Sequence, residues 1–268
     1  TVLRFLTLHG FEPRGVAAAH KQLKSTAAWR RKSGANELRA SLLNGDKLLT
    51  STEVTRLYCC LPFAINHSVT SDGDLLCIAS VGQADIDRFF SSMDYAAWTT
   101  ANLRHCEWLY LRLDQLSLLA GRLVRGCQVF DCHGVGVKHV MPRVLWRAKD
   151  ATLIPDKYYP ELFSRIICVD VFDIAVRAYN VIKPLLSKDM QARIVLHPPG
   201  GVPEILDKAV GLACVPRCYG GHVQVLPMEV RSLLGYELVP QETLDFDFFP
   251  GEPQHLGGYH HGAGLDMS

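Results

Sequence analysis

The chain has 268 residues, with 28 basic and 27 acidic side chains and a formal net charge of +1. This length is ample for one large domain with a sizeable core, and the near-neutral charge argues against a nucleic-acid binder or a polybasic membrane anchor. Hydrophobic residues make up 48% of the chain and charged residues 21%, below the roughly 25% charged residues of ordinary domains. No apolar run reaches the ~18 residues of a membrane-spanning helix.

The N-terminal part of the chain is predicted to be helical. Two helices span Val2 to Arg31, with an interruption at Glu12-Pro13 and an end at Ser33-Gly34. Because Thr1 already lies within the first helical pattern, we expect a fragment of a longer chain, in which no targeting signal can be read. Residues 48–74 are predicted to be irregular, with a turn at 71–74.

Four short apolar segments further along the chain predict β-strands. They are Leu75–Val81, Cys127–Cys132, Arg165–Val171 and Arg193–Leu196. Helical patterns separate them at residues 85–124, with a break near Met93-Asp94, at 139–152 and at 172–186, and a loop is expected at 154–163. Strands that are apolar on both faces and alternate with helices are typical of an α/β protein with a mostly parallel, helix-covered sheet.

The segment Ile174–Leu186 is the most apolar of the predicted helices. Nine of its thirteen residues are apolar, whereas an ordinary surface helix needs a single apolar stripe. Both sides of this helix are therefore expected to meet apolar surroundings. Two interpretations stay open: the helix is buried between the sheet and its neighbours, or one side faces a cavity that holds an apolar ligand.

The cysteines and histidines give little support to metal or enzyme chemistry. The nine cysteines are scattered and lie mostly in apolar runs, which predicts a reducing compartment. Cys214, Cys218 and His222 recur every four residues but lack a fourth zinc ligand. Cys132 and His133 would not meet as nucleophile and base, because adjacent strand residues face opposite sides. We expect no metal, no cofactor and no enzymatic activity, since no nucleotide-binding, hydrolase or metalloprotease motif is present either.

Five segments occur in an informative order. They are RFLTLHGFEPRGVAAAHKQLKSTAAWRRK, SDGDLLCIASVG, VFDCHGVGV, KYYPELFSRIICVDVFDIAVRAYNVIKPLLSKDMQARIVL and VPRCYGG. In this order they resemble the CRAL-TRIO lipid-binding domains of the Sec-fourteen type. The family elements that the five segments resemble are, in turn, the N-terminal helix ending in WR, the DGRPVY strand, the strand and turn with hydrophobic-Asp-x-x-Gly, the YYPE element with the gate helix ending in KP, and the closing LP-x-x-YGG. The resemblance covers residues 3–222.

The resemblance implies a fold and a division of the chain. It implies an α/β CRAL-TRIO fold, in which a mostly parallel sheet floors a hydrophobic lipid cavity with a gating helix, after a small all-helical subdomain. The implied boundaries are 1–45 for that helical subdomain, truncated here, 55–225 for the lipid-binding domain and 226–268 for a C-terminal extension. The gate corresponds to 172–186, and its expected cavity and gate residues are Phe172, Ile174, Val176, Ala178, Tyr179, Val181, Ile182 and Leu185.

The resemblance also suggests residues for a lipid headgroup. Family members that bind phosphatidylinositol use four polar positions, which fall here on Gly10, Glu161, Met190 and Arg193. Glu161 and Arg193 keep the required chemistry, and His9 stands beside Gly10. These three are the expected headgroup residues, although Glu161 and Arg193 would equally suit a structural ion pair.

Other ligands stay open. The turn at residues 136–138 has no hydroxyl for a choline headgroup, and a less polar ligand such as a sterol, a retinoid or a fatty acid fits the two lost headgroup positions. Some relatives carry haem, and His133 and His139 flank that same turn, but a histidine near an apolar strand is more often a packing residue.

Non-enzymatic binding and exchange of a phosphatidylinositol-like phospholipid or another small hydrophobic molecule is the expected function. The expected partners are that lipid and, transiently, a membrane surface, in the cytoplasm and without nucleic acid. The alternative is a lipid-sensing or scaffold module without transfer activity. For that alternative the acidic and aromatic segment 243–252 would bind a protein partner, although its aromatic residues would also suit packing onto the domain.

Overall fold

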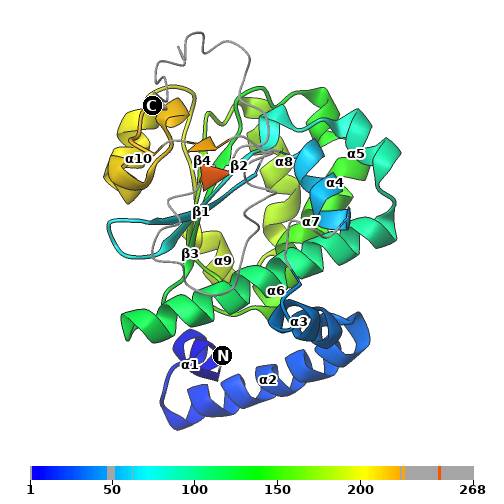
Figure 1. The fold of residues 1–268 in the computed structure, drawn as a ribbon, viewed down its shortest axis with the longest axis vertical. Coiled ribbons are helices and arrows are strands. Elements are labelled where there is room, and N and C mark those ends of the chain that lie inside the picture. Colours follow the sequence, from blue (N-terminus) through cyan, green and yellow to red (C-terminus); the bar gives the residue numbers. More distant parts are fainter. Residues whose placement is uncertain (1, 47–51, 62, 224, 227–246, 249–268) are drawn as a thin grey trace, which may run out of the picture.

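A five-stranded sheet forms the centre of the molecule in the computed structural model, which describes residues 2–46, 52–61, 63–223, 225–226 and 247–248 (Figure 1). The strands follow the order β1 (Phe63–Val69), β2 (Leu75–Ser80), β3 (Gly126–Asp131), β4 (Phe163–Val169) and β5 (Ile194–Leu196). β1 pairs antiparallel with β2, and the other neighbours pair in parallel. The predicted mostly parallel sheet is therefore confirmed.

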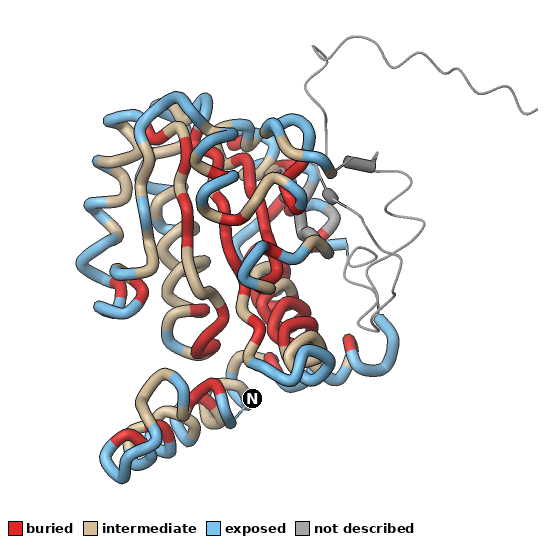
Figure 2. The backbone as a smooth tube through the Cα atoms, turned by 90° about the vertical axis from the view of Figure 1, so that its left-hand side faces the viewer, coloured by how far each residue is buried: buried red, intermediate tan, exposed pale blue. Residues whose placement is uncertain are grey.

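Helices cover both faces of this sheet. One face carries α10 (Val202–Val210), and the other faces α4 (Thr52–Cys60), α5 (Ile86–Ser92), α6 (Tyr95–Ala120), α7 (Pro142–Tyr158) and α8 (Asp173–Ile182) (Figure 1). Alternate strand residues divide between the two sides. Val129 and Ile167 pack with Leu206 of α10, whereas Phe130 and Cys168 point to the α8 side. Buried residues concentrate on the central strands and α6 (Figure 2).

Local signals set the helix boundaries. The Asp94 carboxylate accepts a hydrogen bond of 2.8 Å from the backbone N–H of Ala97, which starts α6 and confirms the predicted break before it. Gly34 ends α2 (Pro13–Ser33) with φ of 77°, a left-handed conformation that glycine adopts without steric cost. Both signals were visible in the sequence.

Two predictions for the backbone are wrong. Residues 52–60 form α4 instead of an irregular segment, because Val54, Leu57 and Cys60 share one helix face and are buried. β1 follows and pairs with β2 across the turn at residues 70–74, although Asn66, His67 and Ser68 interrupt its apolar residues. The predicted loop at 154–163 is also partly helical, since α7 continues through Pro155 to Tyr158. Pro155 removes one helical hydrogen bond, but it is buried.

Three N-terminal helices lie across α6, at the lower end of the molecule in Figure 1. They are α1 (Val2–His9), α2 and α3 (Ala35–Leu43). Trp29 of α2 stacks on Tyr158 with ring centroids 3.9 Å apart. Arg30 donates to both carboxylate oxygens of the buried Glu107 on α6, at 2.6 and 3.0 Å. Stacking and an ion pair thus fasten α2 to the rest of the fold.

Arg4 fastens α1 in the same way. Its guanidinium is 1% exposed and donates to the Asp114 carboxylate of α6 at 2.9 Å. It also donates to the backbone oxygens of Val124 at 2.9 Å and Glu161 at 2.8 Å. Arg4 therefore joins α1 to the C-terminal half of α6 and to the segments that precede β3 and β4.

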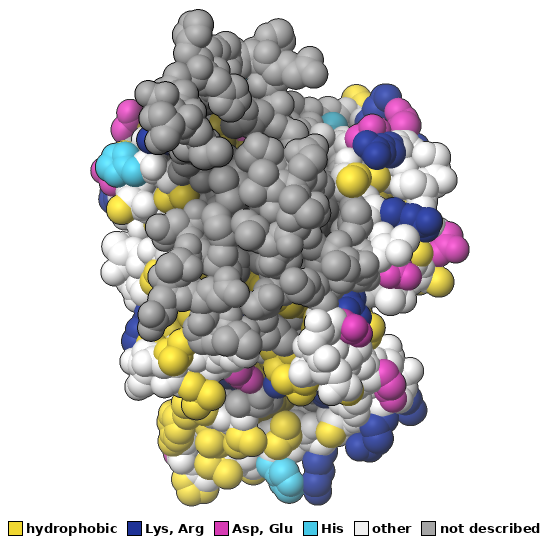
Figure 3. Space-filling model, in the orientation of Figure 1, with side chains coloured by type: hydrophobic (Ala, Val, Ile, Leu, Met, Phe, Trp, Pro, Cys, Tyr) yellow, Lys and Arg dark blue, Asp and Glu magenta, His cyan; other side chains and the backbone are white. Residues whose placement is uncertain are grey.

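The outer surface of the N-terminal helices is apolar in part. Figure 3 shows hydrophobic side chains gathered over this end of the molecule, and the exposed ones there include Leu3, Phe11 and Val16. None of the described helices combines the length and apolarity that crossing a bilayer requires.

The segment 243–252 lies mostly outside the described residues. Its residues Asp247–Phe248 form β7, which pairs in parallel with β6 (Val225–Leu226).

Candidate functional site

The main cavity of the protein lies between the sheet and the α6, α7 and α8 helices. Its volume is about 430 Å³. The sheet contributes Gln128, Phe130, Ile166 and Cys168, which are the residues on the α8 side of β3 and β4. They are register neighbours, Gln128 beside Ile166 and Phe130 beside Cys168, so the alternation of the strands builds a continuous and mostly apolar floor.

One face of α8 forms a wall of this cavity. Ala175, Ala178, Tyr179 and Ile182 line it, and their spacing of three and four residues places them on one side of the helix. No residue of α8 is fully buried, because its inner face borders the cavity instead of packed side chains. This face is the amphipathic stripe that a cavity wall requires.

The eight residues expected at the cavity and gate fall into three groups in the structure. Ala178, Tyr179 and Ile182 line the cavity. Phe172, Val181 and Leu185 are exposed, at 43%, 61% and 52%. The other two residues, Ile174 and Val176, are half-buried and do not line the cavity. The expectation that both sides of the helix meet apolar surroundings within the fold is therefore wrong, because the outer side faces solvent.

Polar residues on the opposite wall were not expected from the sequence. Asn102 and His105 of α6 and Arg147 of α7 line the cavity, and so does His139 at the turn before α7. Burial lowers the pKa of His105 to about 4, so His105 is neutral near pH 7. A signal was present: Asn102 and His105 follow Trp98 at helical spacing, within an otherwise apolar stripe that continues to Leu109.

A second cavity of about 290 Å³ brings together the three expected headgroup residues. His9, Glu161 and Arg193 all line it, although they come from α1, the segment before β4 and the end of α9 (Lys188–Arg193). Pro155, Leu162, Phe163 and Met190 line both cavities. The two cavities therefore share a wall.

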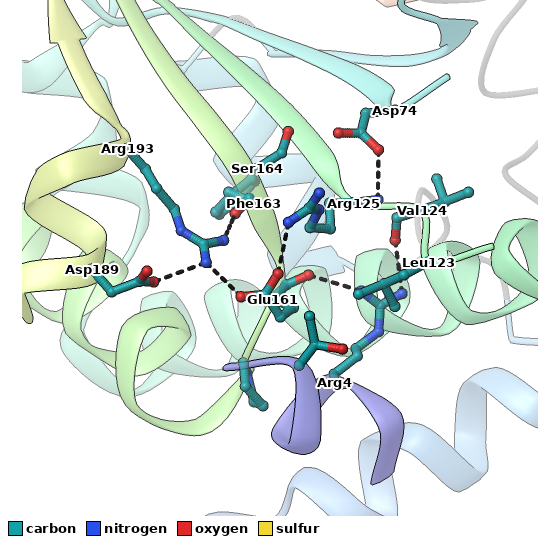
Figure 4. A network of polar contacts seen from close by, with 12 residues as sticks. Arg4, Asp74, Leu123, Val124, Arg125, Glu161, Phe163, Ser164, Asp189 and Arg193 are labelled. Carbon is teal, nitrogen blue, oxygen red and sulfur yellow. Dashed lines mark hydrogen bonds and ion pairs between the residues drawn. The ribbon is translucent and has the colours of Figure 1, made fainter. Parts of the chain in front are cut away.

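Glu161 is the centre of a network of arginines, which Figure 4 shows. Its carboxylate is 3% exposed and accepts from Arg125 at 2.8 Å and from Arg193 at 2.5 Å. Arg4 donates to its backbone oxygen. Glu161 has φ of 56°, a left-handed conformation that costs a non-glycine residue about 1–3 kcal/mol and persists only when its surroundings fix it.

Arg193 is held on several sides. Besides Glu161, it pairs with Asp189 at 2.9 Å and donates to the backbone oxygen of Phe163. Burial by itself would lower the pKa of Arg193, but the hydrogen bond and the charge of Glu161 raise this pKa above its ordinary value. Arg193 is thus cationic at every physiological pH, with its charge balanced by neighbouring carboxylates.

The second cavity is richer in acids than in bases. Asp156, Glu161 and Asp189 line it together with Arg193 and His9. Asp156 accepts from the backbone N–H and the hydroxyl of Ser187 at the start of α9, and the His9 ring lies 2.6 Å from Gln22. Such a site suits hydroxyl groups or a single anionic group better than a cluster of phosphates.

The other cysteines and histidines of the described residues do not assemble into a reactive group. Cys132 lines the main cavity, and burial raises the pKa of its thiol to about 12. The neighbouring His133 side chain is 70% exposed and lies beside Asp170. Cys214 is buried and Cys218 is exposed, and the described part of the chain contains no cluster of three or more His, Cys, Asp or Glu residues arranged to hold a metal ion.

Known proteins resemble this chain in sequence and in structure. The CRAL/TRIO domain family model matches residues 63–221. A protein of Candida glabrata called SEC14 cytosolic factor is 24% identical over 231 residues, which is 84% of this chain and 71% of the relative. Its namesake in Kluyveromyces lactis is 22% identical over 235 residues, 85% of this chain and 72% of the relative.

A solved structure resembles this chain in its fold. The crystal structure of Sfh5 matches 82% of this chain and 70% of that chain, with a TM-score of 0.52 and 17% sequence identity. At this identity the likeness concerns the fold, and it agrees with the α/β arrangement described above.

Proposed function

Because the chain belongs to the CRAL/TRIO domain family, we propose that it binds one lipid or similar hydrophobic molecule in its main cavity and exchanges this molecule at a membrane. The Sec14-like members of this family bind and transfer lipids and are not enzymes. The observation that carries this proposal is the mostly apolar cavity of about 430 Å³ behind α8. Each methylene that moves from water into such a cavity contributes ~0.8 kcal/mol, so the apolar walls supply most of the holding energy.

Helix α8 is the proposed gate. Its inner residues Ala178, Tyr179 and Ile182 would contact the ligand, and it joins the sheet through apolar contacts of Tyr179 and Ile182 rather than through a buried core of its own. Phe172, Val181 and Leu185 expose apolar surface on the outer side, which would contact the membrane when the gate opens. Elements with few buried residues open at low free energy, which suits this role.

The second cavity is the proposed headgroup site, with His9, Glu161 and Arg193 as its recognition residues. Arg193 can bind a phosphodiester while the carboxylates accept hydrogen bonds from hydroxyl groups. An inositol headgroup without further phosphates fits this chemistry, because additional phosphates would meet Asp156 and Asp189. The expected setting is the cytoplasm, in line with nine cysteines that form no disulfide in the described part of the chain.

Native mass spectrometry of the purified chain, together with extraction of lipid from vesicles, tests the proposal. We expect about one bound hydrophobic molecule per chain and transfer between vesicles. A chain with no bound lipid and no transfer would overturn the carrier function and leave the sensing or scaffold alternative.

Substitutions in the second cavity test the headgroup assignment. Arg193→Ala and Glu161→Ala should each reduce the share of phosphatidylinositol among the bound lipids while other lipids still load. Arg125→Ala is the matched control, because Arg125 pairs with the same Glu161 carboxylate but does not line the second cavity. An unchanged phosphatidylinositol share in both cavity variants, or an equal loss in the control, would show that the network is purely structural.

A further inference from the structure

Three buried polar atoms on the wall of the main cavity have no hydrogen-bond partner within the described chain. They are Nδ2 of Asn102, Nε2 of His139 and Nη1 of Arg147. All three are donors. For His139 this follows because its Nδ1 accepts a hydrogen bond of 3.1 Å from the backbone N–H of Gly136, which leaves the proton of the neutral ring on Nε2. Unsatisfied buried donors are costly, so this wall is complementary to a ligand with acceptor atoms.

Arg147 adds a positive charge to this wall. Its guanidinium carbon lies 4.6 Å from the ring centre of Tyr95 and 5.4 Å from that of Trp98, and cation–π attraction offsets part of its desolvation. No ion pair joins Arg147 to a carboxylate among the described residues. Asp150, nearly one turn along α7, accepts a hydrogen bond from the Tyr95 hydroxyl instead.

No other charge competes with Arg147 at this cavity. Among the described lining residues it is the only Lys, Arg, Asp or Glu. His105, on α6 in the same wall, is neutral near pH 7 because burial lowers its pKa to about 4. Arg147 is half-buried, and burying its Nη1 without an anion or another acceptor is unfavourable. The ligand that complements this wall therefore carries one negative charge on acceptor atoms.

The size of the cavity restricts which anionic lipid fits. At about 430 Å³ it lies at the lower end of the ~300–1,000 Å³ that pockets for drug-sized ligands span. A phosphodiester lipid brings two long chains and a headgroup, whereas a fatty acid brings one chain and a carboxylate. A carboxylate is an acceptor-only group with one charge, and it pairs with an arginine in two parallel hydrogen bonds.

We propose that the wall formed by Arg147, Asn102 and His139 is a carboxylate-binding site, and that the main cavity takes a single-chain carboxylic acid of the fatty-acid class. This inference rests on the proposed function, since it names the ligand of the same cavity. It is an alternative to the phosphatidylinositol headgroup assignment, because it gives the main cavity a single-chain ligand and places the acidic group at the α6 and α7 wall instead of at Arg193.

The first test compares how tightly three probes bind to the unmodified full chain. Equilibrium dialysis measures the binding of palmitate, methyl palmitate and hexadecanol, which share a chain and differ in the terminal group. We expect palmitate to bind at least tenfold more tightly than either neutral probe. This arm needs no substitution and therefore does not depend on the folding of a variant.

The second test removes the cation. Arg147→Met keeps the apolar stem, and it should reduce palmitate affinity at least tenfold and methyl palmitate affinity by less than twofold. Arg147→Lys should restore part of the preference for the acid, and Asn102→Leu should weaken palmitate binding to a smaller extent. Arg143→Met is the matched control on the same helix, because Arg143 also lies over an aromatic ring, that of Phe90, but pairs with Asp87 and does not line the cavity.

The outcomes separate the two proposals. Lipid binding without a preference for palmitate over its methyl ester, or a preference that survives Arg147→Met, overturns the carboxylate site and leaves the carrier function standing. Loading of phosphatidylinositol that falls in Arg147→Met, with no binding of palmitate, also overturns the carboxylate assignment. A chain that binds no lipid of any kind overturns the proposed function itself.

Discussion

Glu161 shows how one residue can connect three other parts of the chain. Arg125 precedes β3, Arg193 ends α9, and Arg4 of α1 reaches the backbone oxygen of the same residue. The two arginines that bind the carboxylate remain 34% and 15% exposed, so water reduces part of the Coulomb energy. The buried carboxylate itself, at 3% exposure, is the irreplaceable member of this network.

Glu161→Gln should therefore lower the free energy of unfolding. The change keeps the shape of the side chain but leaves two arginines without their shared anion, which we expect to cost about 2–4 kcal/mol, less than for a fully buried pair. Denaturation in urea measures the change. Glu37→Gln serves as control, since Glu37 is exposed on α3; a loss at Glu161 no larger than at Glu37 would contradict the role assigned to the network.

Single residues of the site differ in how well the sequence predicts them. Glu161, Arg193 and His9 lie in segments with a recognisable motif, and their convergence on one cavity follows from the fold that the motif implies. Arg147 lies in no such motif. Its position depends on how α7 packs against α5 and α6, which is a long-range property, so the sequence shows only an arginine on an amphipathic helix.

Helix α8 shows the limit of composition as a guide to burial. Its apolar residues predicted apolar surroundings on both sides, but only the stripe with Ala178, Tyr179 and Ile182 faces the cavity. An apolar residue on the outer face, such as Val181 at 61% exposure, is not packed into the core formed by the described residues. An apolar surface without a packing role is typical of a contact with another molecule or a membrane.

A large side chain on the inner face of α8 should occupy the ligand volume. Ala178→Trp should reduce the bound lipid per chain by at least half without lowering the melting temperature, because the ring fills a cavity instead of crowding packed atoms. Native mass spectrometry and a thermal melt measure both quantities. Asn180→Trp is the matched control, since Asn180 is exposed on the outer face; equal loading in the two variants would show that α8 does not bound the ligand site.

Elements were predicted best where their signals are local. The break before α6 and the end of α2 follow from Asp94 and Gly34, each of which acts within a few residues. β1 was missed because Asn66, His67 and Ser68 interrupt its apolar pattern, and its pairing with β2 is itself irregular between Ile65 and Val69. α7 was predicted too short because Pro155 is a helix breaker in isolation, whereas burial in the fold keeps it within the helix.

At the scale of the whole molecule, charge and apolar surface determine which kind of force would hold the proposed membrane contact. The sum of charges is only +1, so long-range attraction to an anionic bilayer is weak. The apolar residues exposed on α8 and the preceding turn offer a short-range contact instead, with Phe172 and Val181 as examples. Binding of this kind depends on buried area and little on ionic strength.

Transfer between vesicles should therefore respond weakly to salt. Raising salt from about 0.1 to 1 M shortens the Debye length from ~10 Å to ~3 Å, and we expect the transfer rate to change less than about twofold. A double variant, Asp173→Lys with Asn180→Lys, adds positive charge to the outer side of α8 and should acquire a salt-sensitive preference for anionic vesicles. A rate for the unmodified chain that falls tenfold over this range would contradict the view of a non-electrostatic contact.

The contacts of Arg4 also determine the order in which the fold can be completed during synthesis. Its partners Asp114 and Glu161 lie 110 and 157 residues further along the chain. At ~5–20 residues per second, a ribosome needs roughly 8–30 s to reach Glu161 after Arg4. Until then α1 can pack against α2, which follows it in the chain, and later against α6, but Arg4 lacks its contact with Glu161. α1 is thus synthesised well before its full set of contacts is available.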